Sequence, residues 1–334
     1  MKKLIPLVIL LSLLSSCGGG ELLGIALDPP KRQKIDKSLV GVNDFFVDSQ
    51  FGSISEQYSD IRSNLGLRFV RILVAWTDSV QPSPGASPNF GFYDNILNNI
   101  PAGVDVLITV VHTPSWMSDS ANWINGNPRE TWVKRWLEPV AKRYASVGGV
   151  VGFEVFNEPE RVVVASDTAL GLTSADNYFE MLRLGAASIR ANAPGKKVLN
   201  AATESIQQNY PTKLDYNRRL RDLGAVDLVD VWNIHYYGTS YENVVISNGV
   251  ASFLNSLGKP IWVTETGQQG PDKQLAYVET AWPFLKQKIS SIERFYYYQY
   301  TDTTQPVTSN FGLRTTDSSF PVSDLYVYLR DNAS

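Results

Sequence analysis

Short apolar runs alternate with helical patterns along most of the chain. Eight of these runs are rich in β-branched or aromatic residues, and most are apolar on both faces, which is typical of parallel strands buried within a sheet. The predicted strands span residues 39–45, 69–74, 105–111, 150–156, 197–202, 228–235, 260–264 and 294–299.

Helical spacing of apolar residues marks the segments between several of these strands. The clearest case is 131–144, where Trp132, Val133, Trp136 and Val140 share one helix face. Further helices are predicted at 178–189, 211–223, 241–257, 272–289 and 322–329. Eight strand–helix alternations favour a closed α/β barrel, the (β/α)8 or TIM barrel. An open doubly wound sheet is the alternative, but no Gly-rich phosphate-binding turn follows the first predicted strand.

The bulk composition fits one large domain without a polyanion-binding surface. The chain has 334 residues, of which 43% are hydrophobic and 19% are charged. Barrels of this class often run to about 250 residues or more as a single domain. The formal net charge is −3, and the basic residues are scattered apart from a small cluster at Lys31, Arg32, Lys34 and Lys37. We therefore expect no nucleic-acid partner, and we expect a monomer.

The first residues have the features of an export signal. Lys2 and Lys3 precede an apolar stretch at 4–14, which is too short to span a bilayer. Leu14-Ser15-Ser16-Cys17 then resembles the bacterial lipobox, in which the signal is cleaved before a cysteine that receives a lipid. Cys17 is the only cysteine, so no intramolecular disulfide can form. The alternative is an ordinary signal peptide with an incidental cysteine.

The predicted organisation is a lipoprotein signal at 1–16, a lipidated cysteine with a flexible tether at 17–37, and one barrel domain at 38–334. Gly18-Gly19-Gly20 begins the tether, which would lift the domain off a membrane surface. Gly18 rather than Asp follows the cysteine, which resembles outer-membrane sorting in Gram-negative cells. We therefore expect a lipid-anchored protein of the bacterial cell envelope, at the outer membrane or the cell surface.

Two glutamates follow predicted strands at the edge where a (β/α)8 barrel carries its active site. Glu158 follows the fourth strand in Phe156-Asn157-Glu158-Pro159, and Glu265 ends the seventh in Val263-Thr264-Glu265-Thr266. Glycoside hydrolysis needs two carboxyl groups flanking the scissile bond, one neutral to protonate the leaving oxygen and the other ionised. Because strands four and seven lie on different sides of the barrel, the two glutamates can face each other across its mouth. The alternative is structural, with Pro159 starting a helix and Glu265 capping one.

The motif Asn157-Glu158-Pro159, with a second glutamate ending strand seven, resembles glycoside hydrolase clan A, the retaining (β/α)8 superfamily that includes families 5 and 39. The resemblance implies that Glu158 is the acid/base and Glu265 the nucleophile. It also implies that Asn157 binds the 2-hydroxyl of the sugar at the point of cleavage. The likeness spans the whole mature domain by architecture and is concentrated in a few short motifs.

Other polar residues at the strand ends agree with this resemblance. The chain has two histidines, His112 and His235, which end strands three and six. His235-Tyr236-Tyr237 resembles the clan's His-x-Tyr, which implies that Tyr237 bonds the nucleophile and that His235 lies beside the acid/base; the register between Tyr236 and Tyr237 stays open. Arg71 interrupts an apolar run and needs a partner, and the resemblance implies that it pairs with the nucleophile. The alternatives are structural histidines and a salt bridge at the foot of the barrel.

Aromatic residues near the strand ends are candidate sugar-binding surfaces, because the C–H faces of sugar rings stack on flat side chains. Trp76 follows strand two, and Trp116 and Trp123 lie after strand three. The clan often has a tryptophan at strand eight, where this chain has tyrosines, and Tyr298 or Tyr300 is the candidate substitute. Four other tryptophans are expected in the core and two other glutamates in rim loops: Trp132, Trp136, Trp232 and Trp262, and Glu160 and Glu204.

These residues predict a retaining β-glycosidase that acts on a polysaccharide or oligosaccharide without a cofactor. The long aromatic loops after strands two and three favour an open groove and endo-cleavage, as in β-glucanases and mannanases. Thr113-Pro114-Ser115-Trp116 resembles family 39 relatives that process exopolysaccharides, so exo-cleavage is the alternative. A non-catalytic glycan-binding lipoprotein is an alternative of another class, and it predicts the loss of a carboxylate or of the residues supporting it. No metal site is expected, since the histidines lack ligand spacing, and no G-x-S-x-G turn supports a serine triad.

The lipid anchor is tested by Cys17→Ser. Because the substitution removes the thiol that would receive the lipid, we expect the full-length protein to move from the membrane fraction to the soluble fraction. The measurement is immunoblotting of fractionated cells, with Ser16→Ala as the neighbouring control. A Cys17→Ser protein that stays with the membranes would contradict lipidation at this residue.

Overall fold

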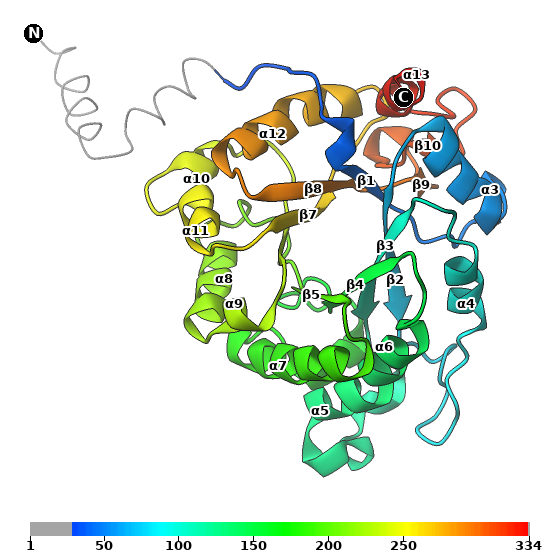
Figure 1. Cartoon of the computed structure of the whole chain (residues 1–334), viewed down its shortest axis with the longest axis vertical. Helices are drawn as coiled ribbons and strands as arrows, with labels where there is room; N and C mark the ends of the chain where they lie inside the picture. Colours follow the sequence, from blue (N-terminus) through cyan, green and yellow to red (C-terminus); the bar gives the residue numbers. More distant parts are fainter. Residues whose placement is uncertain (1–28, 333–334) are drawn as a thin grey trace, which may run out of the picture.

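The computed structural model describes residues 29–332, which form an eight-stranded parallel sheet rolled into a barrel (Figure 1). The strands are β1 (Val40–Asn43), β2 (Phe69–Ala75), β3 (Asp105–Val111), β4 (Val150–Val155), β5 (Lys197–Asn200), β6 (Trp232–His235), β7 (Ile261–Thr266) and β8 (Ile292–Tyr297). Hydrogen-bonded neighbours follow the order β5-β4-β3-β2-β1-β8-β7-β6. A parallel bridge between Leu199 and Val231 joins the two ends of this order. The predicted (β/α)8 barrel is therefore confirmed.

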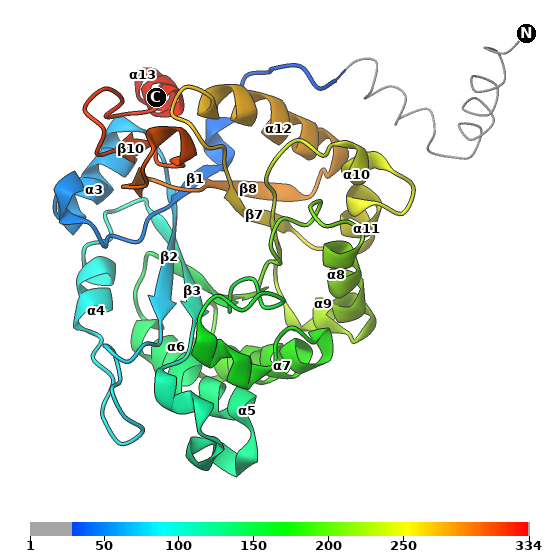
Figure 2. The ribbon, with the colours of Figure 1, turned by 180° about the vertical axis from the view of Figure 1, so that it is seen from behind.

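Helices surround the strands on the outside of the barrel (Figures 1 and 2). They are α3 (Ile54–Ser59), α4 (Gly91–Asn98), α5 (Pro128–Trp132), α6 (Glu138–Tyr144), α7 (Ala175–Asn192), α8 (Thr212–Asp222), α9 (Ala225–Leu228), α10 (Glu242–Val245), α11 (Val250–Ser256), α12 (Gln274–Lys288) and α13 (Asp324–Asp331). Two π-helical segments, Asp60–Asn64 and Val133–Leu137, continue α3 and α5. A small second sheet of β9 (Thr301–Asp302) and β10 (Arg314–Thr315) lies in the segment after β8.

The predicted elements differ from the observed ones mainly at their ends. Strand six begins at Trp232 and not at residue 228, because α9 extends to Leu228 and Val231 makes only an isolated bridge with Leu199. The helix predicted at 241–257 is two helices, since α10 ends at Val245 and α11 begins at Val250. The first two outer helices, α3 and α4, were not predicted, although Ser53 and Glu56 form a capping box at the start of α3.

The chain packs against the barrel earlier than the predicted boundary at residue 38. The backbone N–H of Gln33 donates to the carbonyl of Glu279 in α12, and Ile35 is buried. Arg32 forms an ion pair with Glu279 at 2.6 Å. Cys17 and the predicted signal lie outside the described residues. Within residues 29–332, no helix has both the length and the apolar character needed to cross a membrane.

Two apolar clusters build the barrel. The larger one fills the space between strands and helices. The smaller one is a separate cluster within the strands, made of Phe69, Leu107, Leu199, Val231, Trp262 and Tyr296. Gly41 of β1 makes room for it, since a Cβ there would lie 2.6 Å from the Cβ of Phe69. This apolar layer closes the barrel below the polar side chains that follow along the strands.

Trp76 lies in the larger cluster and is fully buried. Its ring stacks on Trp136 at a centroid distance of 5.9 Å and meets Trp116 edge-on at 5.1 Å. Its indole N–H donates to the side chain of Gln81 at 2.8 Å, so its one polar atom is satisfied inside the protein. The expectation that Trp76 forms a sugar-binding wall is therefore wrong.

Truncation of Trp76 tests this packing. Trp76→Ala removes a fully buried ring between two other tryptophans, and we expect the free energy of unfolding to fall by about 3–5 kcal/mol. Urea denaturation followed by tryptophan fluorescence and circular dichroism measures the change. Phe92→Ala is the control, because the Phe92 side chain is exposed, and it should cost less than about 1 kcal/mol. Equal costs for the two variants would contradict the assignment of Trp76 to the core.

Candidate active site

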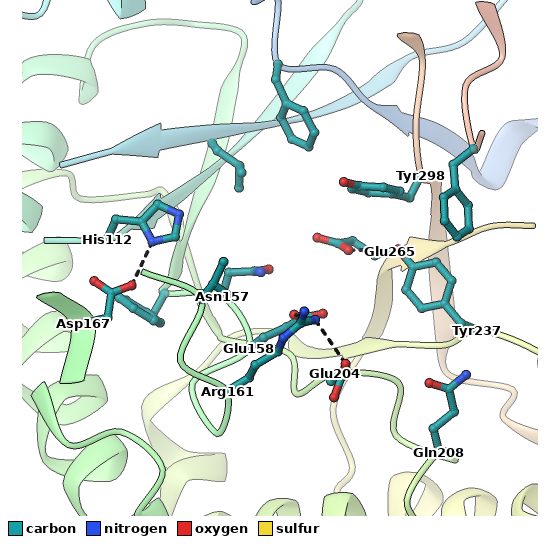
Figure 3. Close-up of a pocket in the computed structure, with 15 residues that line it drawn as sticks. His112, Asn157, Glu158, Arg161, Asp167, Glu204, Gln208, Tyr237, Glu265 and Tyr298 are labelled. Carbon is teal, nitrogen blue, oxygen red and sulfur yellow. Dashed lines mark hydrogen bonds and ion pairs between the residues drawn. The ribbon is translucent and has the colours of Figure 1, made fainter. Parts of the chain in front are cut away.

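A pocket of about 450 Å³ lies at the carboxyl ends of the strands, a volume within the usual range for ligand-binding pockets. Figure 3 shows Glu158 and Glu265 pointing into it, Glu158 from the loop after β4 and Glu265 from β7. Its lining combines carboxylates, amides and aromatic rings: Phe45, Leu73, His112, Phe156, Asn157, Glu158, Arg161, Val163, Asp167, Glu204, Gln208, Tyr237, Glu265, Tyr298 and Phe311. The predicted site of chemistry is therefore one connected cavity.

The carboxylate of Glu265, near the end of β7, is buried and held from three sides. Nη1 of Arg71 lies 2.6 Å from its Oε1, and the hydroxyl of Tyr237 donates to its Oε2 at 2.9 Å. Nε2 of His235 lies 3.6 Å from Oε1. Tyr237, and not Tyr236, bonds the carboxylate, which resolves the register that the sequence left open. Each contact places a positive charge or a donor against the ionised form of Glu265.

These contacts determine the charge state of Glu265. Burial by itself raises the pKa of this carboxyl, but the positive charges of His235 and Arg71 and the hydrogen bonds from Arg71 and Tyr237 outweigh it. The net result is a pKa below the ordinary glutamate value. The pKa of Tyr237 is raised by burial and by the charge of Glu265, so its hydroxyl keeps the proton that it donates. Glu265 is thus an ionised carboxylate in a buried site.

Glu158 lies in the loop directly after β4, on a backbone that is itself unusual. Its φ is 44° and that of Phe156 is 78°, a region that non-glycine residues seldom occupy and that concentrates at functional sites. The backbone N–H of Glu158 donates to the carbonyl of Ala202 after β5, which anchors the loop. Nδ1 of His235 lies 3.1 Å from Oε1 of Glu158. This arrangement holds one carboxylate oxygen and leaves Oε2 towards the pocket and Arg161, 3.4 Å away.

His235 stands between the two glutamates. One ring nitrogen faces Glu158 and the other faces Glu265. Burial lowers the pKa of His235, but the charge of Glu265 and the contact with Glu158 raise this pKa by a larger amount. The net shift of the pKa is therefore upward. The imidazole of His235 therefore lies between the two carboxyl groups and contacts both of them.

The spacing of the two carboxyl groups distinguishes between reaction types. An oxygen of Glu158, a nitrogen of His235 and an oxygen of Glu265 all lie within 4.8 Å of one another. Retaining glycosidases hold their two carboxyl groups about 5–5.5 Å apart, whereas inverting enzymes need about 6.5–9.5 Å to admit a water molecule. The short spacing matches the retaining geometry.

The same three side chains have the spacing of a metal site, which the sequence did not predict. Two features of the site act against a cation there. Arg71 already occupies Oε1 of Glu265, and the raised pKa of His235 favours the protonated ring, whereas a metal ligand must be a neutral imidazole. Both features favour a cluster of interacting titratable side chains over a bound cation.

Arg71 joins the glutamates to the polar layer of the barrel. Its Nη2 donates to the amide oxygen of Asn157 at 2.6 Å, and its Nη1 donates to Asn43 at 2.8 Å. Its Nε contacts Glu154 of β4 at 2.8 Å. Because its amide oxygen is held by Arg71, Asn157 has its NH₂ group left for a ligand in the pocket. The alternative position of Arg71 at the foot of the barrel is excluded.

A family model for cellulases, glycosyl hydrolase family 5, matches residues 32–300. The chain belongs to glycosyl hydrolase family 5. The predicted resemblance to glycoside hydrolase clan A is confirmed by this match. No curated protein sequence matches the chain.

Solved structures share the fold of this family 5 chain at low sequence identity. One is a family 39 glycoside hydrolase from the gut symbiont Bacteroides cellulosilyticus WH2, with 18% identity and a TM-score of 0.62 over 91% of this chain and 64% of that one. An exo-β-1,4-mannosidase from Opitutaceae bacterium strain TAV5 has 17% identity and a TM-score of 0.62, with coverage of 90% and 62%. A monomeric β-xylosidase from Caulobacter crescentus CB15 has 17% identity and a TM-score of 0.60, with coverage of 90% and 69%. This chain spans less than two thirds of the first two proteins.

Most predicted site residues of this family 5 protein meet in the pocket or beneath it. Glu158, Glu265, Asn157, Tyr237, Tyr298 and His112 line the pocket, and Arg71 and His235 lie buried below it. His112 contacts Asp167 at 2.9 Å on the side of the pocket opposite Tyr237 (Figure 3). Neither Trp76 nor Trp116 lines the pocket. Trp116 is only partly buried, and its role as a sugar-binding surface stays a prediction. Trp116 packs on Trp76 and donates to the carbonyl of Gln81 at 2.9 Å.

The aromatic surfaces that do line the pocket come from other strands. Phe45 follows β1, Phe311 lies after β8, and both rings contact Tyr298. Neither phenylalanine was predicted, because nothing in a lone Phe after a strand distinguishes a pocket wall from a core residue. Glu154 was also missed, although a carboxylate inside an apolar strand needs a buried partner just as Arg71 does.

Proposed function

We propose that the protein is a retaining β-glycosidase that acts on a polysaccharide or oligosaccharide, with Glu158 as acid/base and Glu265 as nucleophile. The observation that carries the proposal is the asymmetry of two buried carboxyl groups at retaining distance. Glu265 is held ionised by Arg71 and Tyr237, whereas Glu158 has only His235 and the exposed Arg161 side chain as cationic neighbours. Two carboxyl groups in different environments are what acid and nucleophile roles require.

The proposed reaction proceeds in two displacements. In the first, a Glu265 oxygen attacks the anomeric carbon while Glu158 gives its proton to the leaving oxygen, so the glycosidic bond breaks and an ester to Glu265 forms. In the second, the Glu158 carboxylate takes a proton from water, and the hydroxide oxygen displaces Glu265 from the sugar. Both residues return to their starting forms, and two inversions retain the configuration at the anomeric carbon.

The choice between internal (endo) and terminal (exo) cleavage depends on the shape of the binding site. The preference for endo-cleavage depended on Trp76, Trp116 and Trp123 as walls of an open groove, but these rings pack against the core. The similar structures include an exo-β-1,4-mannosidase and a β-xylosidase. We therefore favour exo-cleavage of a β-linked glycan, with internal cleavage as the alternative. Product lengths from β-glucans, β-mannans, β-xylans and bacterial exopolysaccharides distinguish the two, because exo-cleavage releases only short products of constant length.

We also propose that a lipid on Cys17 holds the enzyme on the cell envelope as a monomer. Sequence supports the anchor through Leu14-Ser15-Ser16-Cys17 and the glycines after it. The described domain begins its contacts with the barrel near Gln33. About fifteen residues separate Cys17 from that point, which can extend over roughly 50 Å. Such a length is sufficient to keep the pocket clear of a membrane surface.

The catalytic assignment is tested by Glu158→Ala and Glu265→Ala. Glu265→Ala should lower turnover of an aryl β-glycoside by about 10⁴-fold or more, because the ester can no longer form. Azide should restore turnover in this variant and give a glycosyl azide of inverted configuration. Glu158→Ala should lower kcat/KM by about 10²–10⁴-fold for leaving groups that need a proton.

Glu56→Gln is the control for both variants, since Glu56 caps α3 away from the pocket. It should leave turnover unchanged. The measurements are initial rates for an aryl glycoside and NMR of the azide product. Wild-type rates in either alanine variant would overturn the assignment of that residue.

Tyr237→Phe tests the electrostatic support of the nucleophile. Glu265 must be ionised to attack, so the acid limb of kcat/KM follows its pKa. The hydroxyl of Tyr237 stabilises the ionised form, and its removal should raise this pKa and move the acid limb to higher pH by about one unit. Tyr236→Phe is the control, because Tyr236 packs in the shell between strands and helices. An acid limb that stays in place in Tyr237→Phe would contradict this role.

A further inference from the structure

A row of alternating charges leads from the rim of the barrel to Glu158. Nη1 of Arg161 lies 3.4 Å from Oε2 of Glu158 and 3.1 Å from Oε1 of Glu204. The other oxygen of Glu204 contacts Nζ of Lys213 at 2.9 Å, and the same ammonium contacts Glu160 at 2.9 Å. Glu160 also accepts the backbone N–H of Glu204 at 2.8 Å. Behind the exposed Arg161 the row thus ends in a buried ion pair.

The carboxylates of this row contact only one nitrogen of the Arg161 guanidinium. Its two carboxylate contacts both use Nη1, and the side chain is 52% exposed. Arg161 and Glu204 both line the pocket, and Figure 3 shows Arg161 beside Glu158 on the side away from Tyr298. An arginine has five N–H donors in a rigid fork. The remaining donors of Arg161 are therefore available to a molecule bound in the pocket.

Under the proposed function, the oxygen of Glu158 that Arg161 faces is the one that transfers the proton. Oε1 of Glu158 is occupied by His235. Oε2 is the oxygen left to face a leaving group, and Arg161 is its charged neighbour. A leaving sugar protonated by Oε2 would lie next to the guanidinium. We propose that Arg161 is a positioning residue that stabilises the Glu158 carboxylate as the proton leaves and donates hydrogen bonds to the leaving sugar.

The proposal rests on the proposed function and adds to it a residue that recognises the leaving sugar. Glu204 shares Arg161 with the acid/base, and Lys213 contacts the other oxygen of Glu204. Glu204 therefore sets how strongly the guanidinium acts on Glu158. The charged and titratable groups that face Glu158 are His235 from β6, Tyr237 after β6, Glu265 from β7, Tyr298 after β8, and Arg161 from its own loop. Arg161 is the member of this set that reaches Glu158 from the solvent side.

The test compares two β-glycosides with the same sugar and different leaving groups. A 2,4-dinitrophenolate departs without a proton, whereas a sugar or alkyl alcohol needs one from Glu158. Arg161→Met should lower kcat/KM by about tenfold or more for the alcohol leaving group and by less than about threefold for dinitrophenolate. Arg161→Lys should restore part of the loss, because it returns the positive charge.

The pH profile provides a second measurement that a merely structural residue would not change. The alkaline limb of kcat/KM for the alcohol glycoside reports loss of the proton from the acid. Removing a cation makes that loss harder, so Arg161→Met should move the limb to higher pH by about half a unit or more. Glu204→Gln should move it to lower pH, because Arg161 then contacts Glu158 alone. Opposite shifts from the two substitutions are expected of opposite charges that act on Glu158, and a merely structural residue would produce neither.

Controls separate the possible outcomes. Arg190→Met removes a similarly exposed arginine of α7, which pairs with Asp230 away from the pocket, and should change neither the rates nor the limb. Equal losses on both glycosides with an unmoved limb in Arg161→Met would overturn the proposal. Turnover of the dinitrophenyl glycoside by the wild-type enzyme tests the proposed function separately, since that reaction needs Glu265 and not Arg161. No turnover by the wild-type enzyme would contradict the proposed function and not the role of Arg161.

Discussion

A guanidinium buried inside a parallel barrel can persist only if neighbouring strands supply acceptors for its donors. Arg71 has no exposed surface, and burying such a charge without partners costs several kcal/mol. Four acceptors meet it: Asn43 at the end of β1, Glu154 in β4, Asn157 after β4, and Glu265 in β7. These contacts hold because the register of β2 against β1 places Arg71 opposite Asn43. A slip of one residue would turn the arginine towards the helices and remove the guanidinium from both Glu154 and Glu265.

The same arginine separates the behaviour of the two glutamates. It touches Glu265 directly and reaches the Glu158 loop only through the amide of Asn157. Glu265 therefore has a buried permanent cation, whereas Glu158 has a histidine that can change its charge and an arginine at the solvent boundary. Coulombic attraction weakens as solvent screening rises, so an exposed guanidinium at 3.4 Å acts more weakly than a buried one at 2.6 Å. Under the proposed function, this difference lets one carboxyl stay ionised while the other exchanges a proton.

The sequence predicted those site residues that are charged and lie in, or at the end of, an apolar strand. A charge in an apolar strand, such as Arg71, must face the barrel interior, and a glutamate where strand seven gives way to a loop must lie at its mouth. Glu154 obeys the same rule and was recognisable by it. The tryptophans were not predictable in this way. Whether Trp76 faces solvent or core depends on Gln81, a partner five residues away in an irregular loop, and on the Trp136 ring brought by a distant helix.

One wall of the pocket is aromatic and another is charged, because different strands and their loops supply them. Phe45 after β1, Tyr237 after β6 and Phe311 after β8 surround Tyr298 at centroid distances of 5.7–6.3 Å, and they form an aromatic wall on the Glu265 side. Arg161 and Glu204, from the loops after β4 and β5, form a charged wall beside Glu158. Apolar rings recognise the faces of a sugar, whereas charged groups recognise its hydroxyls and demand correct hydrogen bonding. A site built in this way tolerates variation least on the side of Glu158, because an unpaired charge costs more than an imperfect stack. Under the proposed function, in which the leaving portion lies beside Glu158, specificity for that portion is therefore expected to exceed specificity for the ring that contacts the aromatic wall.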